Sequence, residues 1–261
     1  MKPFLHSALV LLTIACASTV VWAEPDEDLL SKAQGYPVGN ACTGVVARTP
    51  APSALPKAVN LVAILYRYKN NSYTLNDYFG RQRTTAPLVP KNGEMTAEQH
   101  RCSRTDDARF LSFSMVKRVI SLLFGQALAN GGFNASLHDW CRLDLLLAHD
   151  GQAGMKQVVP LDYLLDATDP AKQPPALRPR TATPYFGYVY QFWLMPVRAR
   201  TFAMQGIHGQ TVHGQPSTST VMVLTSVWES ASGKQNPQPY EERDALWRGV
   251  LQSLGGDLTP Y

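Results

Sequence analysis

The sequence predicts an α+β fold in which helices flank an antiparallel sheet. Segments with the pattern of β-strands occur near both ends of the chain, and helical patterns occupy the middle. Strands before and after a helical middle favour a sandwich in which the last helix and the early strands meet on one sheet. The 261 residues, of which 45% are hydrophobic, can form a substantial core. We therefore expect one large α+β domain.

The first residues are typical of a secretory signal. Lys2 precedes an apolar run over residues 8–14, and small residues then lead to Val21 and Ala23. This order predicts cleavage after Ala23 and a periplasmic or secreted protein. The run is short for a bilayer span, so no stable membrane anchor is expected. A lipoprotein acylated at Cys16 is the alternative.

The signal peptide (1–23) precedes a proline-containing leader (24–60) and a single domain (61–261). The first strands are predicted over 61–68 and 72–75, with a turn at Asn70-Asn71. A second hairpin is predicted over 84–91 and 94–100, because Asn92-Gly93 suits the positive φ angles of a type I′ turn. Pro87 and Pro90 cannot donate to a strand ladder, so their strand should lie at an edge or carry a bulge.

Two longer helices follow. Residues 114–130 are apolar on nearly every side and should be buried on nearly every side, with an end at Asn130-Gly131-Gly132. Residues 136–149 form the second helix, and its buried side comprises Leu137, Leu143, Leu146 and Leu147.

The last part of the chain is predicted to be a short helix, a loop, a meander and a final helix. The short helix runs from Pro160 to Ala167, and a loop rich in proline and arginine covers 170–184. Strands are expected over 185–194, 201–207 and 218–227. The final helix, 241–254, should face inward through Leu246, Trp247, Val250, Leu251 and Leu254.

Charge and cysteine content exclude several classes of function. Loss of residues 1–23 removes only Lys2 among the charged residues, so the net charge changes from +4 to +3. The basic residues form no stripe, so no nucleic-acid partner is expected. Cys42, Cys102 and Cys141 allow one disulfide and one free thiol, with the pairing open. The histidines and cysteines match no zinc spacing, and we expect neither a metal nor a cofactor.

Ser114 and Lys117 are the candidate catalytic residues. Their spacing places a hydroxyl and an amine on one side of the first turn of a buried helix. Burial and the positive end of the helix dipole both disfavour an ammonium, which lowers the lysine pKa and lets the amine accept the serine proton. The alternative is a helix cap at Ser114 with Lys117 extended to water.

The surrounding sequence favours the catalytic interpretation. Residues 110–132, FLSFSMVKRVISLLFGQALANGG, resemble the nucleophile helix of class C β-lactamase-related serine hydrolases, in particular the branch of 6-aminohexanoate-dimer hydrolases. The resemblance continues on both sides of this helix, in the same order along the chain. The block before the helix is residues 66–93, and the blocks after it are residues 133–160 and 185–227. The resemblance covers roughly residues 60–254, and it implies a β-lactamase-like sheet with a serine hydrolase site.

The resemblance also implies an oxyanion hole. Residues 206–210, GIHGQ, stand where other members carry Lys-Thr-Gly on the strand opposite the serine. A backbone N–H of Gly209 or Gln210 would then join that of Ser114, with His208 at the rim. One such donor contributes about 10²- to 10³-fold in rate. The alternative for His208 is a strand histidine that faces solvent.

One departure from the family concerns its second motif, Tyr-x-Asn, on a helical lobe. Here Gly131-Gly132 runs directly into Phe133, so the lobe and its tyrosine are missing near 131–133. The Tyr-x-Asn at Tyr68-Lys69-Asn70 lies upstream in a strand and is interpreted as a coincidence. Tyr188, Tyr190 or His208 could replace the family tyrosine.

The sequence therefore supports two hypotheses of function. The first is a serine hydrolase that acts on a small-molecule amide or ester through an acyl-enzyme, with reduced activity. The second is a non-catalytic remnant that binds a ligand or a partner. Without the lobe, one side of the helix at 114–130 should be bare, and exposed apolar surface favours self-association.

The signal peptide leads to a first prediction. The exported protein should begin at Glu24, because Val21 and Ala23 occupy the small-residue positions of the cleavage site. N-terminal sequencing of the exported protein checks this. An acylated Cys16 or an uncleaved N-terminus would contradict it.

Overall fold

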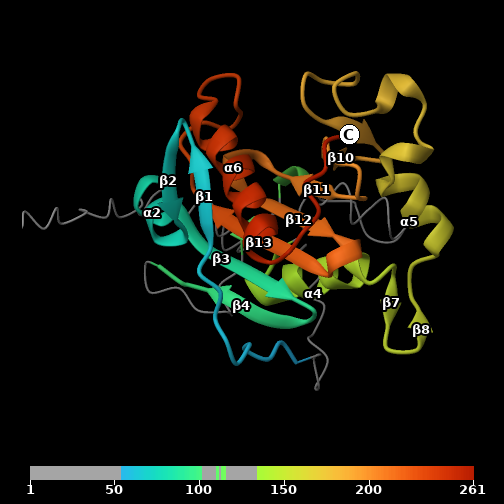
Figure 1. The fold of residues 1–261 in the computed structure, drawn as a ribbon, viewed down its shortest axis with the longest axis horizontal. Coiled ribbons are helices and arrows are strands. Elements are labelled where there is room, and N and C mark those ends of the chain that lie inside the picture. Colours follow the sequence, from blue (N-terminus) through green and yellow to red (C-terminus); the bar gives the residue numbers. More distant parts are fainter. Residues whose placement is uncertain (1–53, 102–109, 112, 116–133) are drawn as a thin grey trace, which may run out of the picture.

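The computed structural model describes residues 54–101, 110–111, 113–115 and 134–261. Within them, seven strands form an antiparallel sheet in the order β4-β3-β13-β12-β11-β10-β9, so the predicted α+β class is confirmed (Figure 1). The strands are β3 (Thr84–Lys91), β4 (Glu94–Glu98), β9 (Gly187–Val189), β10 (Phe192–Leu194), β11 (Phe202–Gln205), β12 (Thr211–Gln215) and β13 (Thr220–Ser226).

Smaller elements surround this sheet. Three two-stranded pairs are β1 (Leu65–Tyr68) with β2 (Asn71–Thr74), β5 (Phe110–Leu111) with β6 (Asn134–Ala135), and β7 (Gln152–Ala153) with β8 (Lys156–Gln157). The α-helices are α2 (Leu75–Arg81), α4 (Leu137–Ala148), α5 (Leu161–Thr168) and α6 (Gln238–Ser253). Short 3₁₀ turns are η1 (Phe113–Met115), η2 (Pro170–Lys172), η3 (Pro175–Leu177), η4 (Ile207–Gly209) and η5 (Pro216–Thr218).

The two faces of the sheet carry separate cores. On β13, Val221 and Val223 belong to the core under α4 and α5, whereas Met222 and Leu224 belong to the core under α6. Figure 1 shows α6 on one face of the sheet and α4 on the other. Every residue of β13 is buried. Among the described helices none is long and apolar enough to cross a bilayer.

Local sequence signals explain where several elements begin and end. Asn92 (φ 51°) and Gly93 (φ 80°) form the predicted turn between β3 and β4. Helix α4 begins after Ser136, whose hydroxyl accepts the backbone N–H of Asp139 at 3.2 Å. The predicted helices at 136–149, 160–167 and 241–254 are confirmed as α4, α5 and α6, although α6 begins three residues earlier.

The strand that contains Pro87 and Pro90 was predicted to lie at a sheet edge or to carry a bulge, and the structure shows the second. It is an interior strand, β3, between β4 and β13, so the edge position was wrong. The β3–β4 register shifts between Val89 and Pro90, which confirms the bulge. A bulge lets an interior strand tolerate the missing proline N–H. The outer edge of β4 is partly covered by residues 56–58 of the predicted leader, through Ala58 N–H to Met95 O at 2.9 Å.

Helix α2 was not predicted. A capping box begins it, with the Asp77 N–H donating to Thr74 Oγ1 at 3.1 Å and the Thr74 N–H to Asp77 Oδ2 at 2.7 Å. The Thr74 N–H and the Thr74 hydroxyl, which also donates to Asp77 Oδ2 at 2.8 Å, lower the pKa of the Asp77 carboxyl group. The preceding hairpin turns at Lys69 (φ 45°) and Asn70 (φ 64°), one residue before the predicted Asn70-Asn71 turn.

A buried carboxylate joins α6 to the early part of the domain. Glu242 is fully buried and accepts from Tyr66 Oη at 2.7 Å and Gln238 Nε2 at 2.9 Å. Arg81 and Gln82 also donate to it. Because the charge is matched and the oxygens are bonded, this buried group holds β1, α2 and α6 together.

Most of the predicted helix at 114–130 lies outside the described residues, as do the predicted signal peptide, Cys42 and Cys102. Residues 113–115 form η1, so the described start of the predicted helix is a 3₁₀ turn. Cys141 is a free thiol buried in α4, and burial raises its pKa.

Asp144 on α4 is a second buried carboxyl group, and its surroundings differ from those of Glu242. It is fully buried, and neither carboxyl oxygen has a hydrogen-bond partner among the described residues. A Cβ added to Gly214 of β12 would lie 3.2 Å from its Oδ1. Burial raises the pKa of Asp144 well above its usual range, so the folded state favours the protonated form.

We predict that Asp144→Asn stabilises the protein increasingly as pH rises. An unfolded Asp ionises near pH 3.9, while folded Asp144 keeps its proton to higher pH, so wild-type stability is lost between the two pKa values. The variant should gain up to about 1.4 kcal/mol of unfolding free energy per pH unit over that window. Urea unfolding at pH 4, 5.5 and 7 measures it. The exposed Asp162→Asn serves as control, and a pH-independent difference for Asp144→Asn would contradict the prediction.

Candidate functional site

Ser114 lies in η1, which packs against β11. Its side chain is half-buried, and the next residue, Met115, is only 1% exposed in the core under α4. This anchoring fixes the position of the serine beside the strand that leads to the second candidate segment. Lys117 lies outside the described residues, so the geometry of the hydroxyl–amine pair is not part of the described structure.

The second candidate segment is a turn rather than a strand. Immediately after β11, His208 (φ 56°) and Gly209 (φ 84°) adopt consecutive left-handed conformations in η4, and Gln210 precedes β12. The predicted strand position of His208 and Gly209 was therefore wrong. A Cβ on Gly209 would lie 2.5 Å from Cδ2 of Trp228. Glycine is thus required at 209 for both its φ angle and its close packing.

Gln210 fastens this turn to the end of β13. Its backbone oxygen accepts the Gly206 N–H at 2.8 Å, and its own N–H donates to Ile207 O at 3.5 Å. The fully buried side chain donates through Nε2 to Ser226 O and accepts the Ser226 N–H at 3.4 Å. Backbone and side chain together hold the turn in one conformation against the sheet.

The ring of His208 is oriented by a main-chain oxygen. Nδ1 lies 2.7 Å from Trp228 O, and a carbonyl can only accept, so the neutral ring carries its proton on Nδ1. Nε2 is then an acceptor. The Trp228 N–H also donates to His208 O at 3.3 Å. The half-buried His208 is therefore held by the turn, and the alternative of a strand histidine that faces solvent was wrong.

The two tyrosines considered as replacements for the family tyrosine lie on β9 and in the β9–β10 turn. Tyr188 donates to Gln191 Oε1 at 2.7 Å. Its strand neighbour Val189 belongs to the core that holds Met115, so Tyr188 points to the other face of the sheet. The ring of Tyr190 contacts that of Tyr163 on α5, with centroids 5.7 Å apart. The sheet therefore separates Tyr188 from the core beside Ser114.

Sequence reasoning missed two residues that shape the turn. Trp228 closes over Gly209, and Ser226 receives the side chain of Gln210. The only sequence signal was a tryptophan just beyond a predicted strand. Across the described ranges, no cluster of histidine, cysteine and acidic residues is placed to hold a metal ion.

We predict that Gly209→Ala destabilises the protein by about 2 to 4 kcal/mol. A left-handed non-glycine residue costs about 1 kcal/mol or more, and the new Cβ would overpack against Trp228. Gly93→Ala is the matched control, because Gly93 has a similar φ of 80° but open space around it. Urea unfolding of both variants measures the difference. Equal losses would show that contact with Trp228 is unimportant.

Comparison with known proteins gives a fold but no sequence family. No protein-family model and no curated protein sequence matches the chain. A solved structure described as "Putative 6-aminohexanoate-dimer hydrolase from Bacillus anthracis" matches with a TM-score of 0.63 and 12% identity, over 77% of this chain and 88% of that chain.

A second solved structure is a penicillin-binding protein homologue from Caulobacter crescentus. It matches with a TM-score of 0.33 and 17% identity, over 46% of this chain and 33% of that chain, and carries no weight for the fold. The match to the Bacillus anthracis structure extends over most of both chains. The chain therefore has the fold of the serine β-lactamase-related hydrolases, as its sequence resemblance implies.

Proposed function

We propose that this protein is a serine hydrolase that cleaves a small-molecule amide or ester through an acyl-enzyme. Ser114 is the nucleophile, and Lys117 is the base that accepts its proton. Backbone N–H groups of Ser114 and Gly209 bind the oxyanion, because the N–H of Gln210 already donates to Ile207 O. The chemical class follows the sequence resemblance and agrees with the fold of the Bacillus anthracis neighbour.

One observation carries the proposal. η1, with Ser114, packs against β11, and β11 runs directly into the η4 turn. Two segments about ninety residues apart in the chain, η1 and the η4 turn, are thus both attached to β11. A turn already fixed by Gln210 and Trp228 has little reorganisation left to make when charge develops on a substrate oxygen.

The proposed reaction follows from these roles. Ser114 Oγ attacks the carbonyl carbon while Lys117 Nζ takes the hydroxyl proton, which gives a tetrahedral oxyanion. Its collapse breaks the bond to the amine or alcohol, and that leaving group takes the proton from Lys117. Water then attacks the acyl-enzyme, releases the acid and restores Ser114.

Turnover should be weak because the family tyrosine has no counterpart in the sequence. A positioned acid–base group contributes about 10²- to 10⁴-fold in rate. Protonation of the leaving group and activation of water both need such a group, whereas the first attack needs mainly the serine, the base and the oxyanion donors. We therefore expect a burst of acylation followed by slow hydrolysis.

We predict that a fluorophosphonate labels the wild-type protein once, and that Ser114→Ala abolishes the label. Lys117→Ala should slow labelling by at least about 100-fold, because the hydroxyl loses its base. Ser112→Ala is the matched control, since this serine lies two residues upstream in the same segment. Intact-mass spectrometry measures the adducts. A p-nitrophenyl ester, nitrocefin and a 6-aminohexanoate dimer then test turnover and substrate class.

The outcomes separate the two hypotheses. Labelling that persists in Ser114→Ala, or that disappears in Ser112→Ala, would remove Ser114 as the nucleophile. Folded wild-type protein that takes no label would support the non-catalytic remnant instead. Turnover at rates normal for such enzymes would show that another group performs the task of the tyrosine.

A further inference from the structure

A cavity of about 410 Å³ lies on the α6 face of the sheet. Its walls come from α6, from residues 180–185 and 195–197, and from the end of the chain. The floor is apolar and largely buried, and it includes Met195, Trp247 and Leu251. These three floor residues lie in or beside the core under α6, whereas Met115, next to Ser114, belongs to the core under α4. The cavity and the proposed catalytic serine are therefore on opposite faces of the sheet.

The outer wall of this cavity is held in place by the main chain. Residues 258–260 run beside residues 196–198, with Val197 and Pro260 forming a bridge. Arg198 N–H donates to Thr259 O at 2.8 Å, and Tyr261 N–H donates to Pro196 O at 3.1 Å. The cavity is thus a formed feature of the fold, and its size falls in the range of sites that bind small molecules.

All polar side chains that line the cavity can donate hydrogen bonds. They are Arg180, Arg248, Tyr185 and Trp247. Arg248 Nη1 donates to Tyr185 Oη at 2.9 Å, which leaves the hydroxyl proton of Tyr185 available to a ligand. Trp247 is fully buried, and its indole N–H has no partner among the described residues. A buried donor without an acceptor is costly unless a ligand or water satisfies it.

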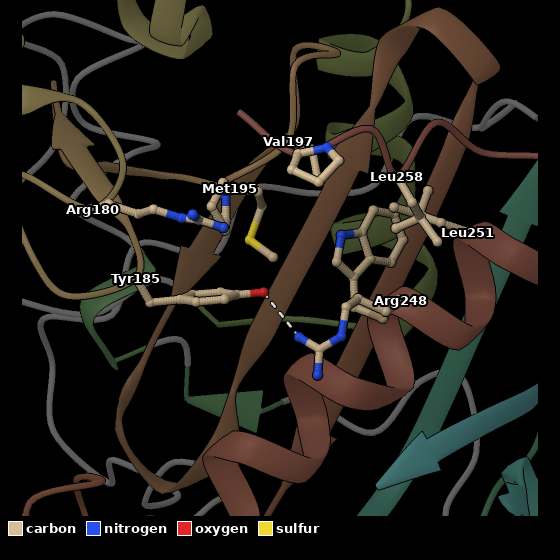
Figure 2. A pocket seen from close by; sticks show the side chains of 10 residues that line it. Arg180, Tyr185, Met195, Val197, Arg248, Leu251 and Leu258 are labelled. Carbon is tan, nitrogen blue, oxygen red and sulfur yellow. Dashed lines mark hydrogen bonds between the residues drawn. The ribbon is translucent and has the colours of Figure 1, made fainter.

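The lining offers no carboxylate to neutralise the two arginines. The nearby acid, Asp244, accepts from Arg243 at 2.8 and 2.9 Å and also attracts Arg248, four residues further along α6. Both lining arginines are exposed at the mouth of the cavity. Figure 2 shows Arg180 extending towards the cavity from one side and Arg248 from the other, with the hydroxyl of Tyr185 directed at Arg248. A ligand that fits must supply acceptors and negative charge at the mouth.

The backbone of Arg180 supports the same conclusion. Its φ is 65°, a left-handed conformation that costs a non-glycine residue about 1 kcal/mol or more. No described residue forms an ion pair or a hydrogen bond with its side chain. The guanidinium of Arg180 therefore lies beside an apolar cavity without a charged partner, and its backbone is strained. An anion bound there would pair with this charge.

We propose that this cavity binds a small organic acid that has an apolar body, with the body on the floor and the carboxylate between Arg180 and Arg248. The apolar residues Met195, Val197, Leu251 and Leu258 accept the body, and the indole N–H of Trp247 and the hydroxyl of Tyr185 meet polar atoms of the ligand. The proposal does not depend on hydrolysis by Ser114, because the two sites lie on opposite faces of the sheet.

Decanoate, decanol and decyltrimethylammonium, each below its micelle concentration, test the proposal by titration calorimetry and tryptophan fluorescence. Decanoate should bind and perturb the fluorescence, and the other two should bind at least about tenfold more weakly. Arg180→Gln and Arg248→Gln should each weaken decanoate about tenfold, since each removes one charged hydrogen-bond donor. Arg67→Gln, at an exposed arginine on β1, should have no effect. Ser114→Ala should bind decanoate as the wild type does.

Four results would overturn the proposal. One is decanol binding as tightly as decanoate, which would show a purely apolar site. Another is an equal loss in Arg67→Gln, which would indicate general attraction to a basic surface. The third is no binding of decanoate to the folded protein. Loss of decanoate binding in Ser114→Ala would also contradict the assignment, because it would place the ligand at the proposed catalytic site.

Discussion

Burial of the central strands on both faces is the constraint on which the rest of the structure depends. β13 exposes none of its seven residues, so each polar group on it needs a partner inside the protein. Thr225 Oγ1 lies 3.1 Å from Thr85 Oγ1, and Ser226 Oγ lies 3.0 Å from Thr84 Oγ1. These bonds tie β13 to β3. The apolar residues of β13 point alternately to the two faces of the sheet, where they join the core under α4 or the core under α6.

This arrangement gives the two faces different chemistry. On the α4 side, η1 brings Ser114 to β11, and Gln210 ties the following turn to Ser226 of β13. The conformation proposed to bind an oxyanion is thus an extension of the sheet rather than a free loop. On the α6 side, the floor of the cavity is part of the second core, and only its mouth carries charge. A ligand at one site would not compete for space with a ligand at the other.

The two cores each contain one buried carboxyl group, and these two groups differ in their hydrogen bonding. Glu242, a residue of α6, accepts hydrogen bonds from four side chains, one of them an arginine. The side chain of Asp144, a residue of α4, has no hydrogen-bond partner in the described part of the chain, and burial raises its pKa. The first therefore joins distant segments, whereas the second weakens the fold wherever it must ionise. Asp144 lies against Gly214 of β12, the strand that follows the η4 turn.

The sequence by itself determined the features whose causes are local. The Asn92-Gly93 turn, helices α4 and α6 and the α+β class follow from dipeptide chemistry and periodicity. The resemblance implied the β-lactamase-like fold and favoured Ser114 as the candidate nucleophile. Helix α2 was not predicted from the sequence, because its capping box lies at the end of a segment that has the pattern of a strand. Only the tertiary structure decided that β3 is interior, that Gly209 packs against Trp228, that Tyr188 faces away, and that Arg180 and Arg248 share one cavity. These features depend on contacts between residues far apart in the chain, which strand order and packing establish and local pattern does not encode.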